Sequence, residues 1–293
     1  MYRITTDTSS DLTTKQLEKL GLGQIPIGLN ITTKKEVLAF PNDEEGLPGP
    51  DRFYELQSGA TGTGTSALSH KLITGVWETI LEAGYDVLHL GIAWDMSIGV
   101  TESVKKAMKE LGEKYPERRI EAPNTYSISV ALGFLLTRMV KLRDDGLDLD
   151  QMLDELDLAA KQTAHWFTVD DLGWLITGGR ISGFSGYLGQ MLNIKPLMRL
   201  PYGGVLEPVR KVRGSKKLLV ALAEKVRDTI IDQSGEIWVA YGSIEQKSRA
   251  VELAEIVQQM LPSAEISFHR IGPIIGAHTG PSVIAIFFFA NER

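Results

Sequence analysis

The sequence predicts an α/β protein of two domains, and three observations support this prediction. In residues 1–165, short apolar runs alternate with segments whose apolar residues recur every three or four positions, which is typical of a mainly parallel sheet flanked by helices. From residue 166 onward, strand-like runs dominate, and the turn at residues 201–204 joins two of them as in a hairpin. The length of 293 residues is sufficient for two domains of usual size. We therefore expect an N-terminal α/β domain (1–165) and a C-terminal α/β domain with a mixed or antiparallel sheet (166–293).

Apolar periodicity and glycine positions define the expected elements of the N-terminal half. Leu72, Val76 and Ile80 stand four residues apart, with Trp77 and Leu81 beside them, which predicts a helix that begins near Ser66. Residues 32–51 are charged and contain proline, so we expect a ribbon-like insertion there. We expect strands at residues 2–6, 24–31, 86–93 and 119–122, and helices at residues 13–21, 66–81, 99–111, 127–142 and 149–164.

In the C-terminal half, two helices are expected between the strands. Leu218, Leu222 and Val226 lie on one face of the first helix, and Leu253 and Val257 lie on one face of the second. We expect strands near residues 166–169, 196–200, 205–212, 237–241, 266–271 and 283–289.

Composition and charge exclude several classes of function. A net charge of −6 and a pI near 5.5 argue against nucleic-acid binding, which requires a basic surface, and the basic residues 210–217 form only a local segment. The absence of cysteine excludes disulfides and thiolate metal sites, and the five histidines show no metal-ligand spacing, so we expect no metal. No stretch approaches the roughly 18 apolar residues of a membrane span, and the N-terminus does not resemble a signal peptide. We expect a cytoplasmic protein.

Small hydroxyl residues cluster at three places, residues 5–10, residues 61–69 and Ser97, which are expected at strand ends or helix starts. In a parallel sheet such positions converge at the carboxyl ends of the strands, where helix N-termini favour an anion such as a carboxylate or phosphate. The alternative is that these residues only cap helices. A nucleotide site is weakly supported, because TGTGTS lacks the lysine of a phosphate-binding loop.

His278 lies in the sequence IGPIIGAHTGP, where glycine and proline surround one histidine and one threonine. We expect a loop whose backbone approaches a ligand closely. The alternative is a structural turn whose histidine bonds only backbone groups. A serine hydrolase built from Ser97 or Ser66 with His278 is a further alternative, although the sequence contains no G-x-S-x-G elbow.

Four motifs in the C-terminal half occur in an order and at spacings that resemble the DegV family. They are GGRIS (178–182), LNIKP (192–196), KVRGSKK (211–217) and IGPIIGAHTGP (271–281). TTDTSSDL near the N-terminus resembles the opening of the family, and TSALS (65–69) matches its T-S-x-x-S motif. The resemblance covers nearly the whole chain.

The resemblance implies a bacterial two-domain protein that holds a long-chain fatty acid between its domains and presents the carboxylate to an ATP-dependent fatty acid kinase. It assigns Thr65, Ser66, Ser97, His278 and Thr279 to the carboxylate and Arg180 to the phosphorylated head or the kinase. No catalytic residue and no cofactor is implied, and transient contact with a membrane surface is compatible with this role.

The sequence departs from the family pattern at four places. Ala67-Leu68 replaces the usual Gln-Pro, Trp94 and Met96 replace small residues, and Asn124 stands where aspartate is common. Two other functions stay open: a serine-dependent esterase or thioesterase, and a regulatory protein that lipid merely stabilises.

Overall fold

The computed structural model describes residues 1–40, 46–181 and 194–293. Ser182 of GGRIS, Leu192 and Asn193 of LNIKP, and part of the expected insertion therefore lie outside the described residues. The chain forms two compact units, and the predicted boundary after residue 165 remains a prediction. The first unit comprises Met1–Asn30, Val37–Leu47 and Thr65–Ala160, and the second comprises Ile31–Glu36, Pro48–Gly64 and Lys161–Arg293.

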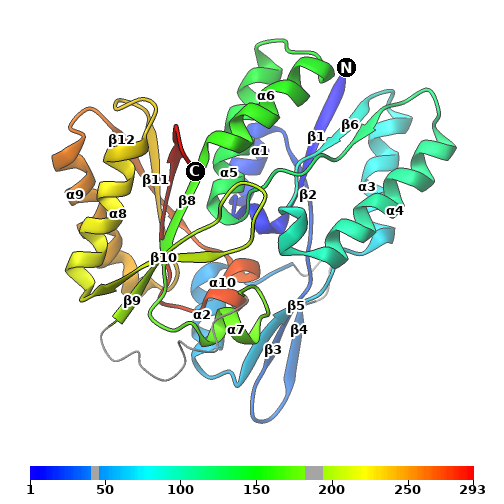
Figure 1. The fold of residues 1–293 in the computed structure, drawn as a ribbon. Coiled ribbons are helices and arrows are strands. Elements are labelled where there is room, and N and C mark those ends of the chain that lie inside the picture. Colours follow the sequence, from blue (N-terminus) through cyan, green and yellow to red (C-terminus); the bar gives the residue numbers. More distant parts are fainter. Residues whose placement is uncertain (41–45, 182–193) are drawn as a thin grey trace. The chain divides into compact units, whose positions relative to one another are not determined.

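The first unit contains a parallel four-stranded sheet in the order β2-β1-β6-β7. Helices α3 and α4 pack on each other on one side of the sheet, and α1, α5 and α6 lie on the other side (Figure 1). The elements are β1 (Tyr2–Asp7), β2 (Gly23–Ile25), β6 (Asp86–His89), β7 (Ile120–Glu121), α1 (Thr14–Leu20), α3 (His70–Glu82), α4 (Ile98–Lys114), α5 (Ser129–Asp144) and α6 (Leu149–Gln162), with 3-10 turns η1 (Thr8–Ser10) and η2 (Trp94–Met96).

Helix α1 shows how the local sequence defines an element. Thr13 and Gln16 form a capping box at its start, in which each side chain bonds the backbone N–H of the other residue. Gly21 ends the helix in the left-handed region, with a φ of 61°, where glycine is favoured because it has no side chain. The predicted helix at residues 13–21 is confirmed.

The prediction of one strand at residues 24–31 is wrong. β2 ends at Ile25, and a separate strand, β3 (Leu29–Thr32), belongs to a different sheet with the order β4-β3-β5. Pro26 has no N–H for a strand ladder, and the N–H of Ile27 donates to the Thr8 hydroxyl at 2.9 Å, so neither residue can continue β2. The other strands of this sheet are β4 (Val37–Phe40) and β5 (Gly62–Thr65).

The predicted helix near Ser66 begins four residues later, at His70, with Ser69 as its N-cap residue. Thr65 still belongs to β5, and the N–H of Ser66 donates to the carbonyl of Gly28 at 3.0 Å, so Ser66 is not helical. The buried face of α3 is Ile73, Trp77 and Leu81, so Trp77 and Leu81 of the predicted stripe are buried, whereas its other members are only half-buried.

The second unit contains a six-stranded mixed sheet in the order β10-β9-β8-β13-β11-β12, in which only β11 and β12 pair in parallel. β9 and β10 form the predicted hairpin. The predicted fold class, with one parallel and one mixed sheet, is confirmed. The elements are β8 (Thr163–Thr168), β9 (Ile194–Arg199), β10 (Glu207–Arg213), β11 (Glu236–Tyr241), β12 (Glu265–Arg270), β13 (Ile284–Phe289), α2 (Pro50–Ser58), α7 (Gly173–Thr177), α8 (Ser215–Thr229), α9 (Lys247–Met260), α10 (Pro273–Thr279) and the 3-10 turn η3 (Ile244–Gln246).

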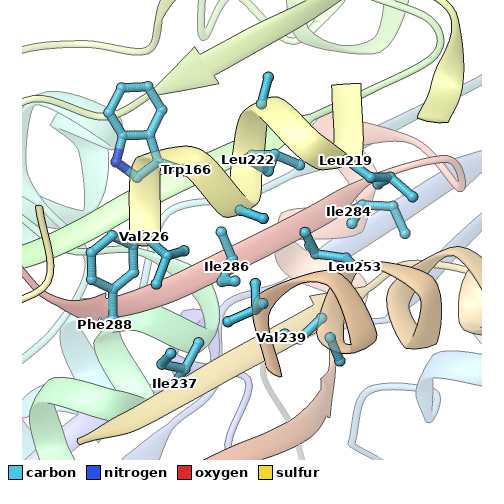
Figure 2. Close-up of a cluster of buried hydrophobic side chains, with 14 of the residues drawn as sticks. Trp166, Leu219, Leu222, Val226, Ile237, Val239, Leu253, Ile284, Ile286 and Phe288 are labelled. Carbon is cyan, nitrogen blue, oxygen red and sulfur yellow. The ribbon is translucent and has the colours of Figure 1, made fainter. Parts of the chain in front are cut away.

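The core of the second unit lies between this sheet and helices α8 and α9 (Figure 2). Leu222 of α8 and Leu253 of α9 are fully buried with Ile286 of β13. Close packing of this kind makes truncation of any one of these side chains costly.

The expected loop around His278 is instead the short helix α10. Pro273 occupies the first turn, where its missing N–H is no loss, and Gly280 ends the helix with a φ of 74°. Helices α2 and α7 were also not predicted, and both are short. No helix within residues 1–40, 46–181 and 194–293 is both long and apolar enough to cross a membrane.

Candidate functional site

In the first unit, hydrogen bonds from neighbouring segments fix the backbone between the end of β6 and Ser97. The Leu90 carbonyl accepts from the Thr6 hydroxyl at 2.7 Å, and the Gly91 carbonyl accepts from the Thr125 hydroxyl at 2.7 Å. The Ala93 N–H donates to the Ser127 carbonyl at 2.8 Å. This segment, residues 90–97, is called the Ser97 loop below, and its backbone is fixed by side chains from β1 and residues 124–127.

The first hydroxyl cluster, residues 5–10, serves this scaffold. Thr5 accepts a hydrogen bond from the Trp77 indole N–H at 3.2 Å and shares a second hydrogen bond with Nδ1 of His89 at 3.1 Å. Thr6 holds the Ser97 loop and Thr8 holds Ile27. These three hydroxyls therefore bond groups of the scaffold: Thr6 donates its proton to the Leu90 carbonyl, whereas Thr8 accepts from the N–H of Ile27.

Asp7 lies at the centre of the scaffold and is fully buried. Its Oδ1 accepts from the N–H of Ser9 at 2.8 Å and from the Ser9 hydroxyl, and its Oδ2 accepts from the N–H of Ile92 at 2.8 Å. Burial raises the pKa of the Asp7 carboxyl, although the donors from Ser9 and Ile92 oppose this effect. A Cβ atom at Gly91 would lie 2.5 Å from Asp7 Oδ2 and 2.6 Å from His89 Nε2, so only glycine fits there.

In the first unit, the start of α4 meets the segment that precedes α3. A Cβ atom at Gly99, in the first turn of α4, would lie 3.1 Å from the Cβ of Ala67, in the segment before α3. The structure thus brings TSALS (65–69) beside Ser97. Ser97 and Ser69 occupy the N-cap positions of α4 and α3, and neither side chain makes a capping hydrogen bond. The capping alternative therefore fails for Ser97.

This arrangement suits a small anion. The backbone N–H groups of a helix's first turn lack partners within the helix, and the helix dipole places partial positive charge there. Ser97 is half-buried and Ser66 is exposed, so both hydroxyls can be reached by a ligand. Thr65 is half-buried at the end of β5. A carboxylate can only accept hydrogen bonds, and hydroxyls beside the start of α4 provide donors that it needs.

In the second unit, α10 is fixed by side chains from α2 and β5. The Tyr54 hydroxyl donates to the Ile271 carbonyl at 3.1 Å, the Gln57 amide to the Gly276 carbonyl at 2.9 Å, and the Thr63 hydroxyl to the Ala277 carbonyl at 2.6 Å. Three carbonyl groups at or near α10 are satisfied in this way, and the position of His278 follows from them.

The structure brings GGR (178–180) beside His278. A Cβ atom at Gly178 would lie 2.5 Å from His278 Nδ1, which explains the need for glycine at this position. Burial lowers the pKa of His278 to about 4, and the Arg180 guanidinium adds to this effect, so the imidazole is neutral at neutral pH. Arg180 donates to the Gly178 carbonyl, and burial lowers its pKa.

Thr279 has a different environment from the one that the resemblance implies. Its buried hydroxyl donates to the carbonyl of Ile275, one turn earlier in α10, at 3.1 Å. In this rotamer the hydroxyl proton is used within the helix. Thr279 would have to rotate in order to donate to a carboxylate, and its assignment remains a prediction.

Residues 1–291 match the sequence model of a family described as "Uncharacterised protein, DegV family". The chain belongs to the DegV family. A DegV domain-containing protein of Deinococcus radiodurans is 30% identical over 285 residues, which cover 97% of this chain and 96% of the relative. The resemblance drawn from the motifs is thereby confirmed.

Solved structures of DegV proteins have the same fold. A structure of a DegV family protein from Thermus thermophilus, described as showing fatty acid binding, has a TM-score of 0.83 and 25% identity, with 99% of each chain covered. The Fatty Acid Kinase (Fak) B3 protein of Streptococcus pneumoniae, loaded with linoleic acid, has a TM-score of 0.82 and 19% identity, with coverage of 99% of this chain and 100% of that one.

Positions that depart from the DegV pattern have structural roles in this chain. Leu68 and Met96 are buried. The Asn124 side-chain oxygen accepts from the N–H groups of Trp94 at 3.1 Å and Tyr126 at 3.0 Å, so it holds the Ser97 loop as well. The Trp94 ring lies under the Lys105 ammonium, 4.4 Å from the ring centroid.

Sequence reasoning missed Asp7, Asn124 and Thr125 as parts of this site. The sequence did contain a signal for them. Asp7 ends a buried strand, and Asn124 and Thr125 precede a helix, so all three are polar residues expected near the carboxyl ends of strands. Within the described ranges, no group of three or more His, Asp or Glu side chains could hold a metal ion.

Proposed function

We propose that this DegV protein binds a long-chain fatty acid and holds its carboxylate at the start of α4, beside Ser97. The observation that carries the proposal is that the Ser97 hydroxyl stands at the start of α4, makes no capping bond, and lies in the part of the unit that TSALS approaches. Thr65 and Ser66 would supply further donors, and His278, as a neutral imidazole, would supply an N–H.

Relatives support the choice of ligand. The Thermus thermophilus relative is described as binding fatty acid, and the Streptococcus pneumoniae relative carries linoleic acid. Each matches this chain over 99% of its length, so the comparison involves the whole fold.

The energetics favour a ligand with a long apolar tail. Burial of each methylene contributes ~0.8 kcal/mol, so a dozen contribute on the order of 10 kcal/mol before ordering costs. A hydrogen bond to a charged head contributes only about 1.5–3 kcal/mol after desolvation. The tail therefore provides most of the affinity, and the hydroxyls select and orient the carboxylate.

We further propose that the protein is a non-catalytic subunit that presents the carboxylate to an ATP-dependent fatty acid kinase. Support comes from the kinase name of the Streptococcus pneumoniae relative. It also comes from Arg180, which pairs with no carboxylate in the part of the chain that the structure describes. A guanidinium in this state is suited to a phosphate or to an acidic partner group.

Calorimetric titration tests the proposal directly. Lipid would be removed from the purified protein, which would then be titrated with linoleic acid. We expect saturable binding of one fatty acid per chain. A flat titration from a folded sample would contradict the proposal. In parallel, hydrolysis of a chromogenic acyl ester by the wild-type protein, abolished in Ser97→Ala, would support the esterase alternative instead.

A further inference from the structure

Asp7 connects two segments of the first unit that the chain order keeps far apart. Its two carboxyl oxygens have different partners: Oδ1 accepts from Ser9, and Oδ2 accepts from the N–H of Ile92, 85 residues away. Ile92 lies within the Ser97 loop. Asp7 is thus the carboxyl group that attaches the end of β1 to the loop that ends at Ser97.

Asp7 cannot itself contact a ligand. Its side chain has no exposed surface, and a carboxyl would repel a bound carboxylate in any case. The space beside Oδ2 is also closed, because Gly91 and His89 approach it closely. Its effect on a ligand can therefore operate only through the backbone that it holds.

The other side-chain bonds to the Ser97 loop come from neutral groups, among them the hydroxyls of Thr6 and Thr125 and the side-chain oxygen of Asn124. The first two donate to carbonyls, whereas Asp7 and Asn124 accept from N–H groups. Asn124 is already an amide. At Asp7, replacement by asparagine would exchange the accepting oxygen Oδ2 for an NH₂ donor.

We propose that Asp7 is a positioning residue for carboxylate recognition, which fixes the Ser97 loop through its bond to the Ile92 N–H so that Ser97 stands at the start of α4. This inference rests on the fatty-acid binding proposed above. It assigns to the aspartate of TTDTSSDL a role in selecting the head group, without contact to it.

Asp7→Asn is the informative variant. Asparagine has the same shape, and its oxygen can still accept both bonds from Ser9. Its NH₂ group would then face the Ile92 N–H, so two donors would oppose each other and the loop would lose its attachment. Asp11→Asn is the matched control, because Asp11 belongs to the same motif and bonds Ser129 at 2.6 Å. Asp11 has a φ of 54°, a conformation that asparagine tolerates well.

The experiment compares the affinity for stearic acid with that for stearyl alcohol, which has the same tail and no carboxylate. In Asp7→Asn we expect the affinity for the acid to fall roughly tenfold and the affinity for the alcohol to stay unchanged. Asp11→Asn should change neither. In a ¹H–¹⁵N spectrum, the Ile92 amide proton should move upfield in Asp7→Asn, because it no longer bonds a carboxyl.

Two results would overturn the inference: an unchanged preference for the acid in folded Asp7→Asn, or an equal fall for acid and alcohol. Failure of the wild-type protein to bind stearic acid would instead refute the proposed function. If Asp7→Asn does not fold, Thr125→Val gives the same comparison, since it releases the loop at Gly91. An unchanged preference in that variant would reject the premise that a fixed Ser97 loop selects the head group, and the role of Asp7 with it.

Discussion

Gly99 lies so close to Ala67 that a Cβ atom at position 99 would be 3.1 Å from the Cβ of Ala67, shorter than most side-chain contacts. Gly99→Ala should therefore move the segment before α3 away from Ser97 by a few tenths of an ångström. We expect weaker binding of fatty acid in this variant, measured by calorimetry.

Gly112→Ala is the control, because it lies in the same helix and a Cβ atom there meets nothing within 4 Å. It should raise the free energy of unfolding by about 0.5–1 kcal/mol and leave binding unchanged. Equal fatty-acid affinities in the two variants would show that the contact between Gly99 and Ala67 is irrelevant to the site.

Most of the elements could be predicted from the sequence because long helices and buried strands carry a clear apolar period. Leu218 and Leu222 of α8 are examples, since both are fully buried on the expected face. Local rules failed where tertiary bonds decide. Pro26 separates β2 from β3, and the hydrogen bond from the Ser66 N–H to the Gly28 carbonyl delays the start of α3. Neither effect appears in the periodicity of apolar residues.

The candidate site was predictable only in part. Ser97 at a strand-to-helix junction follows from pattern alone, and the structure places it at the N-cap of α4. The supporting bonds from Asp7 and Asn124 join residues 85 and 30 positions apart, and sequence spacing contains no information about such pairs. The grouping of Arg180 with His278 likewise depends on the close approach of Gly178 to α10.

Ser97→Ala and His278→Ala should each weaken fatty-acid binding, because a buried carboxylate would lose a donor at ~1–3 kcal/mol. Ser234→Ala is a suitable control, since Ser234 is exposed and donates to Asp232 at 2.7 Å. Calorimetric titration of the three variants decides the question. Wild-type affinity in both Ser97→Ala and His278→Ala would mean that these residues have only structural roles.

Arg180→Ala should separate binding from turnover. Burial of the tail provides most of the affinity, so uptake of fatty acid should stay nearly normal. Formation of acyl phosphate with ATP and the partner kinase should be lost, because the phosphorylated head or the kinase loses a cationic contact. Arg52→Ala, at an exposed arginine paired with Glu55, is the control. Full turnover in Arg180→Ala would assign this arginine a structural role.

The free energy of unfolding should fall as the pH is lowered from 6.5 toward 4. Burial lowers the pKa values of His89, His269 and His278 to about 4, below the ordinary value of 6.5, so the unfolded chain binds protons in this range that the folded chain does not. At pH 5 each such histidine should account for a loss of roughly 2 kcal/mol. The raised pKa of Asp7 acts in the opposite direction, since its contribution to stability is lost as the pH rises.

Denaturant unfolding at pH 7.5 and pH 5 measures this dependence, and histidine ring signals in NMR spectra assign it to individual residues. The ring of His89 should remain neutral down to about pH 5, because its pKa is about 4. Titration of that ring near 6.5 would contradict the burial that the structure shows.

The identity of the lipid that the protein carries when it is first purified tests the central claim most directly. Native mass spectrometry of protein freshly purified from a bacterial host, followed by denaturing extraction, gives both the mass and the stoichiometry of any bound lipid. We predict one fatty acid per chain, released on denaturation. Repeated absence of bound lipid, together with no uptake of added linoleic acid by the folded protein, would contradict the account.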